Sequence, residues 1–421
     1  MIMKHRIEKS SEGTYYTVPF EVPENVEKIT VSYSYDKHTQ GITGQSKKAN
    51  IVDLGLINAD GQFVGWSGSA RSSVTVALSG GTEGYFAQKI KAGTWQIIVG
   101  AYKLCGDFID VEYNIDFTMK QNRFYFGDLH VHSLASDGKF SAYELGMKAK
   151  KLGLDFLALA DHNNYSENFS LPKIDGVTFI PAVEWTHYKG HMNLFGVRAP
   201  FENSFVANSV DDMRSLISQA KALGATVSVN HPECGVCPYL WGDDDVYDMM
   251  EIWNGPMTPR NTRAIEKWTE LLKSGRQIPI VGGSDFHGGP MPVVRLGNPV
   301  TAAYCDSPDG DSIMNAIRAG HSFVTSGVKG VELMLRCGDA MMGDRVPCDN
   351  TAELEIEVKN NRRSKLILVT ALGEKEIKPS EGICRVSVSL DDKFAYVKAV
   401  SKLFKYEYVT AITNPIYLDG E

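Results

Sequence analysis

The chain has 421 residues, of which 43% are hydrophobic and 22% are charged. This length allows two or three domains, and the composition is that of an ordinary globular protein. The formal net charge of −8 argues against a large phosphate-backbone-binding surface, so we expect no nucleic-acid partner. No apolar run approaches the roughly 18 residues of a membrane span, and the first residues form no apolar signal segment. We therefore expect no membrane association, and the seven scattered cysteines fit reduced thiols in a cytoplasm.

The first part of the chain, residues 1–122, is predicted to be an all-β domain. Apolar side chains alternate with Thr and Ser over residues 29–35, which is the period of a half-buried strand. Further strand-like runs cover 50–57, 73–79, 94–101 and 111–118. Short strands separated by turns predict a β-sandwich.

The middle part, residues 123–327, alternates between strand-like and helical runs. Apolar residues three and four apart predict helices at 141–152, 210–223, 259–274 and 309–319. Short apolar runs predict strands at 155–160, 177–183, 192–197, 225–229, 249–253, 278–281 and 299–304. This alternation is typical of βαβ units with a mainly parallel sheet, and about seven strands predict a (β/α) barrel.

The last part, residues 328–421, returns to strand-like runs. They cover 331–336, 352–358, 364–370, 383–389 and 395–400. A second β-sandwich is the expected arrangement. The role of the two flanking domains and the oligomeric state stay open at this point.

Histidine and acidic residues gather where the apolar runs of the middle part end. Asp128, His130 and His132 alternate along one extended segment, so their side chains can face the same way. In parallel α/β folds, functional groups lie at the ends of the strands. Later strand ends carry Asp161, His162, Glu184, His191, His231, Asp285 and His287. Imidazole and carboxylate together suit Zn²⁺, Mn²⁺ or Fe²⁺, so the pattern predicts a site for divalent metal ions.

These motifs, in this order, resemble those of the PHP (polymerase and histidinol phosphatase) superfamily. They are Asp128-Leu-His-Val-His-Ser, Ser136-Asp137-Gly138, Ala160-Asp161-His162, Pro181-Ala-Val-Glu184, Gly190-His191, Asn230-His231-Pro232 and Gly283-Ser-Asp285-Phe-His287. Two further motifs resemble the branch that includes carbaryl hydrolases, namely Phe323-Val-Thr-Ser-Gly327 and Thr413-Asn-Pro-Ile-Tyr417. The resemblance covers residues 124–325 and implies a distorted (β/α)₇ barrel that binds two or three divalent ions.

The resemblance also implies which residues hold each ion, with Glu184 shared between two of them. The first position would use His130, His132, Glu184 and Asp285. The second would use Glu184, His191 and His231. The third would use Asp137, His162 and His287. Asp128 and Asp161 match positions where a carboxylate orients a ligating histidine.

Such a metal centre has a definite chemistry. Two ions about 3.5–4 Å apart can bind a phosphoryl oxygen and can lower the pKa of bound water from about 15.7 to about 7. Three carboxylates, three divalent ions and one hydroxide leave a charge of about +2, which attracts a small anionic substrate. We therefore expect hydrolysis of a small phosphate monoester or diester by a metal-activated hydroxide. The alternatives are a carboxylic ester or carbamate hydrolase with the same centre, and a non-catalytic binding protein.

Several neighbouring residues keep two interpretations. His187 competes with His191 as a ligand, and Cys234-Gly-Val-Cys237 is interpreted as an ordinary loop because a structural zinc site needs a second cysteine pair. A substrate wall or simple loop packing would each explain Trp185, Tyr239 and Trp241. Phosphate binding or surface exposure would each explain Arg198, Arg263 and Arg295. Glu251 is interpreted as a polar residue of the wall.

Overall fold

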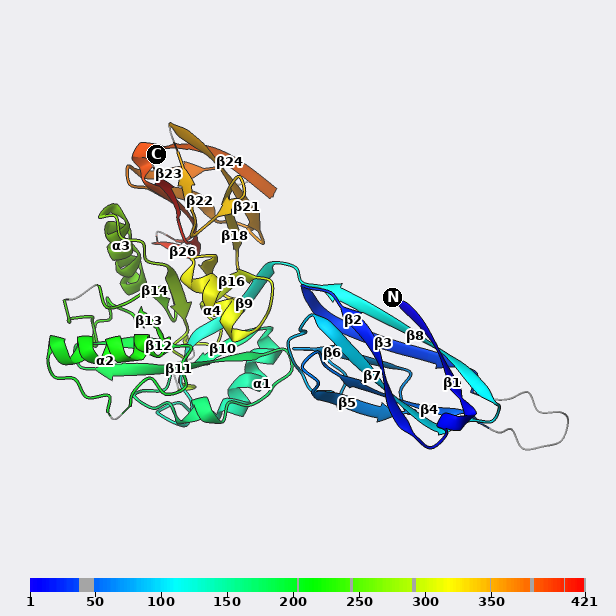
Figure 1. Ribbon diagram of the computed structural model, residues 1–421. Coiled ribbons are helices and arrows are strands. Elements are labelled where there is room, and N and C mark those ends of the chain that lie inside the picture. The colour runs from blue at the N-terminus through cyan, green and yellow to red at the C-terminus, as the bar shows by residue number, and fades with distance from the viewer. Residues whose placement is uncertain are drawn as a thin grey trace. The chain divides into compact units, whose positions relative to one another are not determined.

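A computed structural model describes residues 1–37, 49–202, 204–242, 245–289, 293–348, 350–378, 382–404 and 406–419. The chain divides into two compact units, Met1–Gln121 and Asn122–Glu421 (Figure 1). Among the helices described, none has the length and apolar character needed to cross a bilayer.

The first unit consists of two four-stranded antiparallel sheets, with the orders β1-β8-β3-β6 and β2-β7-β4-β5. Its strands are β1 (Ile2–Glu8), β2 (Tyr15–Val22), β3 (Val26–Tyr35), β4 (Ile51–Ile57), β5 (Phe63–Gly68), β6 (Ser73–Ala77), β7 (Gly93–Lys103) and β8 (Phe108–Met119). One hydrophobic core joins the two sheets and includes Val31 of β3 and Ile97 of β7. The alternation over residues 29–35 therefore marks the inner face of one sheet.

The second unit begins with alternating strands and helices. The strands are β9 (Arg123–Val131), β10 (Phe156–Leu159), β11 (Thr178–His187), β12 (Gly190–Phe195), β13 (Thr226–Val229), β14 (Met249–Asn254), β15 (Ile280–Gly283), β16 (Val300–Cys305) and β17 (Ser322–Thr325). The helices are α1 (Ala142–Leu152), α2 (Val210–Ala222), α3 (Pro259–Lys273) and α4 (Gly310–Arg318). The four predicted helices are confirmed, with small shifts at their ends.

Helix α1 illustrates the local signals that set these boundaries. The Ser141 side chain accepts a hydrogen bond from the backbone N–H of Glu144, and the Glu144 carboxylate accepts one from the backbone N–H of Ser141. This reciprocal pair satisfies two free donors of the first turn. The helix ends at Gly153, whose φ of 80° is the left-handed conformation favoured by glycine.

The central sheet is mixed, which corrects the prediction of a mainly parallel one. β9, β10 and β11 are parallel, as are β13, β14 and β15. However, β12 is antiparallel to both β11 and β13, and β16 is antiparallel to β9 and β17. The reason is local: only Tyr188 and Lys189 link β11 to β12, and a parallel crossover needs a dozen or more residues.

The strand ladders follow an open path from β15 through β9 to the C-terminal strands. Between β15 and β9 the structure has an isolated bridge, Val131 with Phe286, in place of a ladder. The closed (β/α)₇ barrel therefore stays a prediction. What the pairing establishes is a mixed α/β unit dominated by its sheet.

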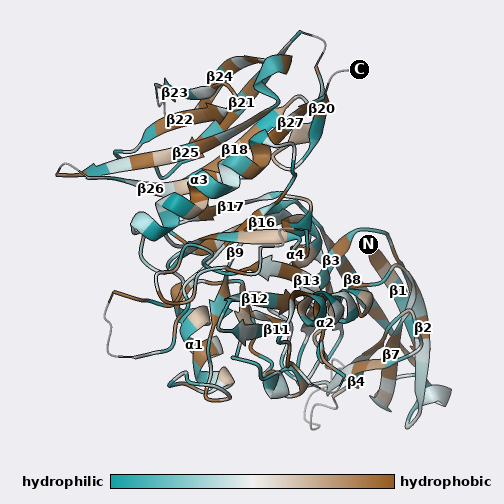
Figure 2. Cartoon of the chain, turned by 90° about the vertical axis from the view of Figure 1, so that its left-hand side faces the viewer, coloured by the Kyte–Doolittle hydropathy of each residue, from teal (hydrophilic) through white to brown (hydrophobic). Residues whose placement is uncertain are grey.

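The C-terminal strands continue this sheet, because β17 pairs with β26. These strands are β18 (Glu332–Cys337), β19 (Ala340–Met341), β20 (Arg345–Pro347), β21 (Thr351–Lys359), β22 (Lys365–Thr370), β23 (Gly373–Ile377), β24 (Gly382–Ser389), β25 (Phe394–Leu403), β26 (Tyr406–Thr413) and β27 (Ile416–Asp419). Figure 2 shows apolar segments along β18, β22 and β25, which share one core. Residues 328–421 thus form two layers, and one of them is an extension of the central sheet.

Buried Asn414 adds to this connection. Its side-chain oxygen accepts a hydrogen bond from the backbone N–H of Ile280 at 2.9 Å, and its side-chain nitrogen donates to the carbonyl of Ser322 at 2.9 Å. The residue thereby connects the end of the chain to the starts of β15 and β17. Because Asn414 is fully buried, both hydrogen bonds form in a dry environment, where an unpaired amide is costly.

Candidate metal centre

The residues predicted as ligands lie in or just after six strands of the second unit. They are His130 in β9, His132 and Asp137 after it, His162 after β10, Glu184 in β11, His191 in β12, His231 after β13, and Asp285 and His287 after β15. Two of them, His231 and Asp285, have positive φ values of 28° and 53°. Such backbone strain costs roughly 1–3 kcal/mol per residue and is concentrated at functional sites.

The buried carboxylate of Glu184 is surrounded by five imidazoles. From Oε1 the distances are 3.1 Å to Nδ1 of His191, 3.3 Å to Nε2 of His130 and 3.4 Å to Nε2 of His231. From Oε2 they are 2.7 Å to Nδ1 of His162 and 3.7 Å to Nε2 of His132. Both oxygens of Glu184 thus lie close to imidazole nitrogens, so each oxygen is placed to contribute to a metal site.

Two further carboxylates extend the cluster toward solvent. Asp285 Oδ1 lies 3.0 Å from His132 Nε2 and 3.5 Å from His130 Nε2. Asp137 Oδ1 lies 3.2 Å from His287 Nε2 and 3.8 Å from His162 Nε2. The Asp137 side chain is 60% exposed, whereas His130 and His132 are fully buried. The cluster therefore runs from a dry interior to an open mouth.

The donor atoms fit divalent ions. Within the described residues, three buried polar atoms of the cluster make no well-oriented hydrogen bond, although imidazole or carboxylate atoms lie near them: His130 Nε2, His132 Nδ1 and Glu184 Oε2. A buried polar atom without a partner is destabilising. Several sets of three or four ligand atoms lie within 4.8 Å of one another, among them His132, Asp137, His162 and His287. Nitrogen and oxygen donors at this spacing suit a divalent ion.

The electrostatics of the cluster agree with this fit. Burial opposes ionisation of Glu184, but the charge of His130 and the imidazole hydrogen bonds outweigh burial and hold the pKa of Glu184 well below its usual value. Burial likewise opposes protonation of His130, but Glu251, Glu184 and Asp285 raise its pKa well above the usual value. These two shifts favour an ionised Glu184 beside a protonated His130, whose proton occupies a place where a metal would bind.

The residue that orients His130 is Glu251, which the sequence had indicated only as a wall residue. Its Oε1 lies 2.9 Å from His130 Nδ1, and its Oε2 accepts hydrogen bonds from the backbone N–H of His231 at 3.0 Å and from Asn254 Nδ2 at 3.1 Å. Glu251 is buried within β14. It fixes the ring of one predicted ligand and the backbone of another, so Nε2 of His130 is free to face Glu184.

Asp128 and Asp161 have different partners from those expected. Asp128 accepts hydrogen bonds from the backbone N–H groups of Ser284 and Gly297, at 2.9 and 2.8 Å. Burial raises its pKa to about 6, against the opposing effect of these bonds. Asp161 accepts hydrogen bonds from the backbone and hydroxyl of Ser133, each at 2.7 Å. Both carboxylates thus hold the loops that carry the predicted ligands, Asp128 through backbone N–H groups and Asp161 through Ser133.

His191 and His187 lie in different surroundings. His191 contacts Glu184, whereas the His187 ring packs against Trp241 at a centroid distance of 4.6 Å. The aromatic residues of this region are buried: Trp185 stacks on Trp241 at 5.5 Å and donates a hydrogen bond to a backbone carbonyl, and Tyr239 is 7% exposed. Loop packing therefore explains all three aromatics.

The three candidate arginines differ in surroundings. Arg198 and Arg295 are exposed, and Arg263 pairs with Glu233 at 3.6 Å. Arg260, which the sequence had not singled out, lies 3.6 Å from Cys234 Sγ.

The loop after His231 was expected to be ordinary, but it enters the cluster. Cys237 Sγ lies 3.7 Å from His231 Nδ1 and 3.2 Å from Cys234 Sγ. Ligand atoms of His191, His231 and Cys237 lie within 4.8 Å of one another. The sequence argument compared the cysteine pair with a four-cysteine zinc site. In the structure the pair lies near two histidines instead, His231 across a turn and His191 about 40 residues earlier in the chain.

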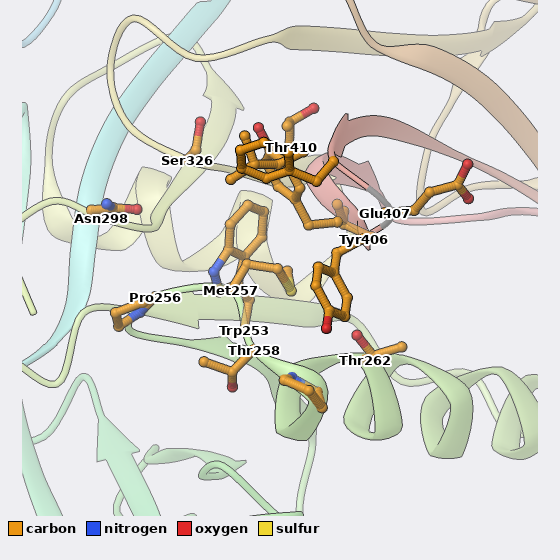
Figure 3. A pocket seen from close by; sticks show the side chains of 15 residues that line it. Trp253, Pro256, Met257, Thr258, Thr262, Asn298, Ser326, Tyr406, Glu407 and Thr410 are labelled. Carbon is orange, nitrogen blue, oxygen red and sulfur yellow. The ribbon is translucent and has the colours of Figure 1, made fainter. Parts of the chain in front are cut away.

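A separate hollow of about 720 Å³ lies between the start of α3 and the strands β25 and β26. Figure 3 shows the rings of Trp253 and Tyr406 in its lining, with Thr258 and Thr262 from the α3 side. Glu407 is the charged residue of this lining, which contains no lysine or arginine among the residues described. The hollow therefore has no cation to bind a phosphate group.

No family model and no curated protein matches this chain. Among solved structures, it is similar to a two-domain Bacteroides vulgatus protein containing a predicted PHP-like metal-dependent phosphoesterase. The identity is 17% and the TM-score 0.41, over 69% of this chain and 95% of that chain. It is also similar to an amidohydrolase from Chromobacterium violaceum, with 15% identity and a TM-score of 0.28, over 40% and 89% of the two chains. At these low scores, the geometry of the cluster is the basis for assigning a function.

Proposed function

We propose that this protein is a metal-dependent hydrolase of the PHP superfamily, with a distorted (β/α)₇ barrel, that cleaves a small phosphate monoester or diester. The observation that carries the proposal is Glu184, a fully buried carboxylate that faces five imidazoles. The order of the motifs along the chain supports the same assignment. The motifs at residues 323–327 and 413–417 support placing it in the carbaryl-hydrolase-like branch.

Three ion positions follow from the ligand sets. His130, His132, Glu184 and Asp285 would hold the first ion; Glu184, His191 and His231 the second; Asp137, His162 and His287 the third. When bound, such divalent ions acidify water to give a nucleophile at neutral pH and stabilise charge on the substrate and the leaving oxygen. The third set is the most exposed, since the side chains of Asp137 and His287 are 60% and 29% exposed. Substrate would therefore enter from this side.

The chain's own residues prepare the centre for this chemistry. Glu251 orients His130, and Asn230 donates a hydrogen bond to Glu184 Oε1 at 2.9 Å. These contacts hold the bridging carboxylate in one orientation before any ion or substrate arrives. Burial of Glu184 also excludes water from the carboxylate, which strengthens its electrostatic interactions.

The test combines metal analysis with a substrate panel. Purified protein is assayed for Zn, Mn and Fe content, then supplied with each metal and offered phosphate monoesters, phosphate diesters, carboxylic esters and carbamates. We expect turnover of a phosphate ester. Turnover of carboxylic esters or carbamates alone would assign the same centre to that chemistry, and protein without bound or bindable metal would point to a non-catalytic binding protein.

A matched pair of variants tests the ligand assignment. His191→Ala should lower both metal content and rate, because His191 contacts Glu184. His187→Ala removes an imidazole four residues earlier, one that packs against Trp241, and should leave both nearly unchanged. Equal effects of the two substitutions would contradict the assignment of His191.

A further inference from the structure

The loop after His231 brings two thiols together. Cys234 Sγ and Cys237 Sγ are 3.2 Å apart, and both residues are partly exposed. The loop is held in place by a hydrogen bond from the backbone N–H of Cys234 to the carbonyl of His231 at 2.8 Å, and by one from Tyr239 to Pro232 at 3.0 Å. Only a small movement would bring the two sulfur atoms to the bonding distance of about 2.0 Å.

The same loop connects the thiols to the cluster through one imidazole. His231 Nδ1 lies 3.7 Å from Cys237 Sγ, and His231 Nε2 lies 3.4 Å from Glu184 Oε1. In a metal site, the nitrogen that does not bind the ion usually interacts with a polar group that fixes the ring. Cys237 occupies that place for His231.

The surroundings of Cys234 favour its reaction as the first nucleophile. The guanidinium of Arg260 lies 3.6 Å from its sulfur, and the backbone N–H of Val236 donates to that sulfur at 3.4 Å. A positive charge and an N–H donor both stabilise a thiolate, which is the reactive form of cysteine. Partial exposure lets a small molecule reach it.

We propose that Cys234 and Cys237 form a reversible dithiol–disulfide pair that controls metal binding at His231; the control of metal binding rests on the proposed function. The Cys234 thiolate attacks a low-molecular-weight disulfide, forms a mixed disulfide and releases one small thiolate. Cys237 then loses its proton, attacks the Cys234 sulfur and releases the second small thiolate. The two cysteines lose two electrons and two protons, and the small disulfide gains them as two thiols.

Oxidation changes what His231 contacts. A thiol or thiolate at Cys237 can donate to or accept from the imidazole, whereas a disulfide sulfur carries neither a proton nor a negative charge. Loss of such a supporting contact typically weakens metal binding by about 10–100-fold. The disulfide form should therefore hold an ion at the His191 and His231 position less tightly.

The test uses the full chain, prepared metal-free, in a series of glutathione redox buffers. Intact mass and peptide mapping should reveal a product about 2 Da lighter with Cys234 linked to Cys237. Calorimetric titration with Mn²⁺ alone, which has little affinity for thiolates, should then show that oxidation weakens binding by about 10-fold or more. Dithiothreitol should restore the affinity.

Cys234→Ser and Cys384→Ser serve as matched variants. Cys234→Ser keeps Cys237 beside His231 but cannot form the disulfide, so its affinity for Mn²⁺ should not respond to oxidation. Cys384→Ser removes a thiol of β24 and should behave like the unsubstituted protein.

The outcomes separate the two proposals. If no redox buffer produces a Cys234–Cys237 disulfide, or if the oxidised and reduced proteins bind Mn²⁺ equally well, the proposed redox control is overturned. Reduced protein that binds neither Mn²⁺ nor Zn²⁺ would overturn the proposed function and the metal-control half of this inference, while disulfide formation would still be measured.

Discussion

Replacing Glu251 with glutamine should weaken metal binding through His130. The carboxylate accepts hydrogen bonds on both oxygens, from His130 Nδ1 on one side and from His231 and Asn254 on the other. In Glu251→Gln one oxygen becomes an NH₂ group. Whichever way the amide is turned, this group faces a donor: either His130 Nδ1, or the His231 N–H and Asn254 Nδ2. A buried donor left unsatisfied costs about 1–3 kcal/mol. That range matches the roughly 10–100-fold loss of metal affinity typical for removing the residue that orients a ligand.

The assay is calorimetric titration with Mn²⁺, with Glu270→Gln as the control. Glu270 undergoes the same chemical change on the exposed face of α3, where it pairs with Lys273. We expect the control to keep its affinity and Glu251→Gln to lose about 10–100-fold. Unchanged affinity in Glu251→Gln would refute the orienting role of this carboxylate.

The same substitution should also change how the stability of the metal-free protein depends on pH. Glu251 is the strongest of the carboxylates that raise the pKa of His130 above its unfolded value. A raised folded pKa stabilises the protein below the unfolded pKa, and this stabilisation is lost as the pH rises through the folded pKa. Glu251→Gln should therefore lower the free energy of unfolding of the metal-free protein more at pH 5 than at a pH above the raised pKa of His130. Urea unfolding at the two pH values measures this difference.

Three further predictions concern the same centre. Gly283→Ala should destabilise the protein by about 1–3 kcal/mol in urea unfolding, because its Cβ would lie 2.3 Å from Cβ of His130 and 2.9 Å from Glu251 Oε1; an unchanged midpoint would mean that the backbone moves freely there. Apparent affinity for Mn²⁺ should increase with pH, since the pKa values of His130 and His231 are raised and metal binding must displace these protons; a pH-independent affinity would contradict this. Chelation should lower the unfolding temperature, with a loss of about 2.7 kcal/mol at an ion concentration 100 times Kd; equal melting with and without chelator would count against a bound ion.

The helices and the residues of the cluster were predictable because their signals are local. A serine three residues before a glutamate starts α1, and a glycine ends it. The residues of the cluster follow from a simple rule, since a polar residue just past an apolar run is expected at a strand end. The sequence could therefore indicate His130, Glu184, His231 and Asp285 together, and the structure brings them into contact.

The supporting residues were not predictable in the same way. Asp128 and Asp161 share strand-end positions with true members of the cluster, yet they bind loop backbone. Glu251 and Cys237 looked like a wall residue and a loop residue, yet they contact His130 and His231. A strand-end position says that a side chain is near the site, but not which neighbour it meets.

The sequence by itself indicated the four helices and many of the strands, and the His, Asp and Glu residues of the cluster, because strand period, helix caps and turn residues act over a few positions. The tertiary structure alone decided the continuation of the central sheet into β26 and the partners of each residue of the cluster. Glu251 and His130 are 121 residues apart and meet at 2.9 Å. Such a contact depends on the packing of separate strands into one sheet, and no local pattern in the chain encodes it.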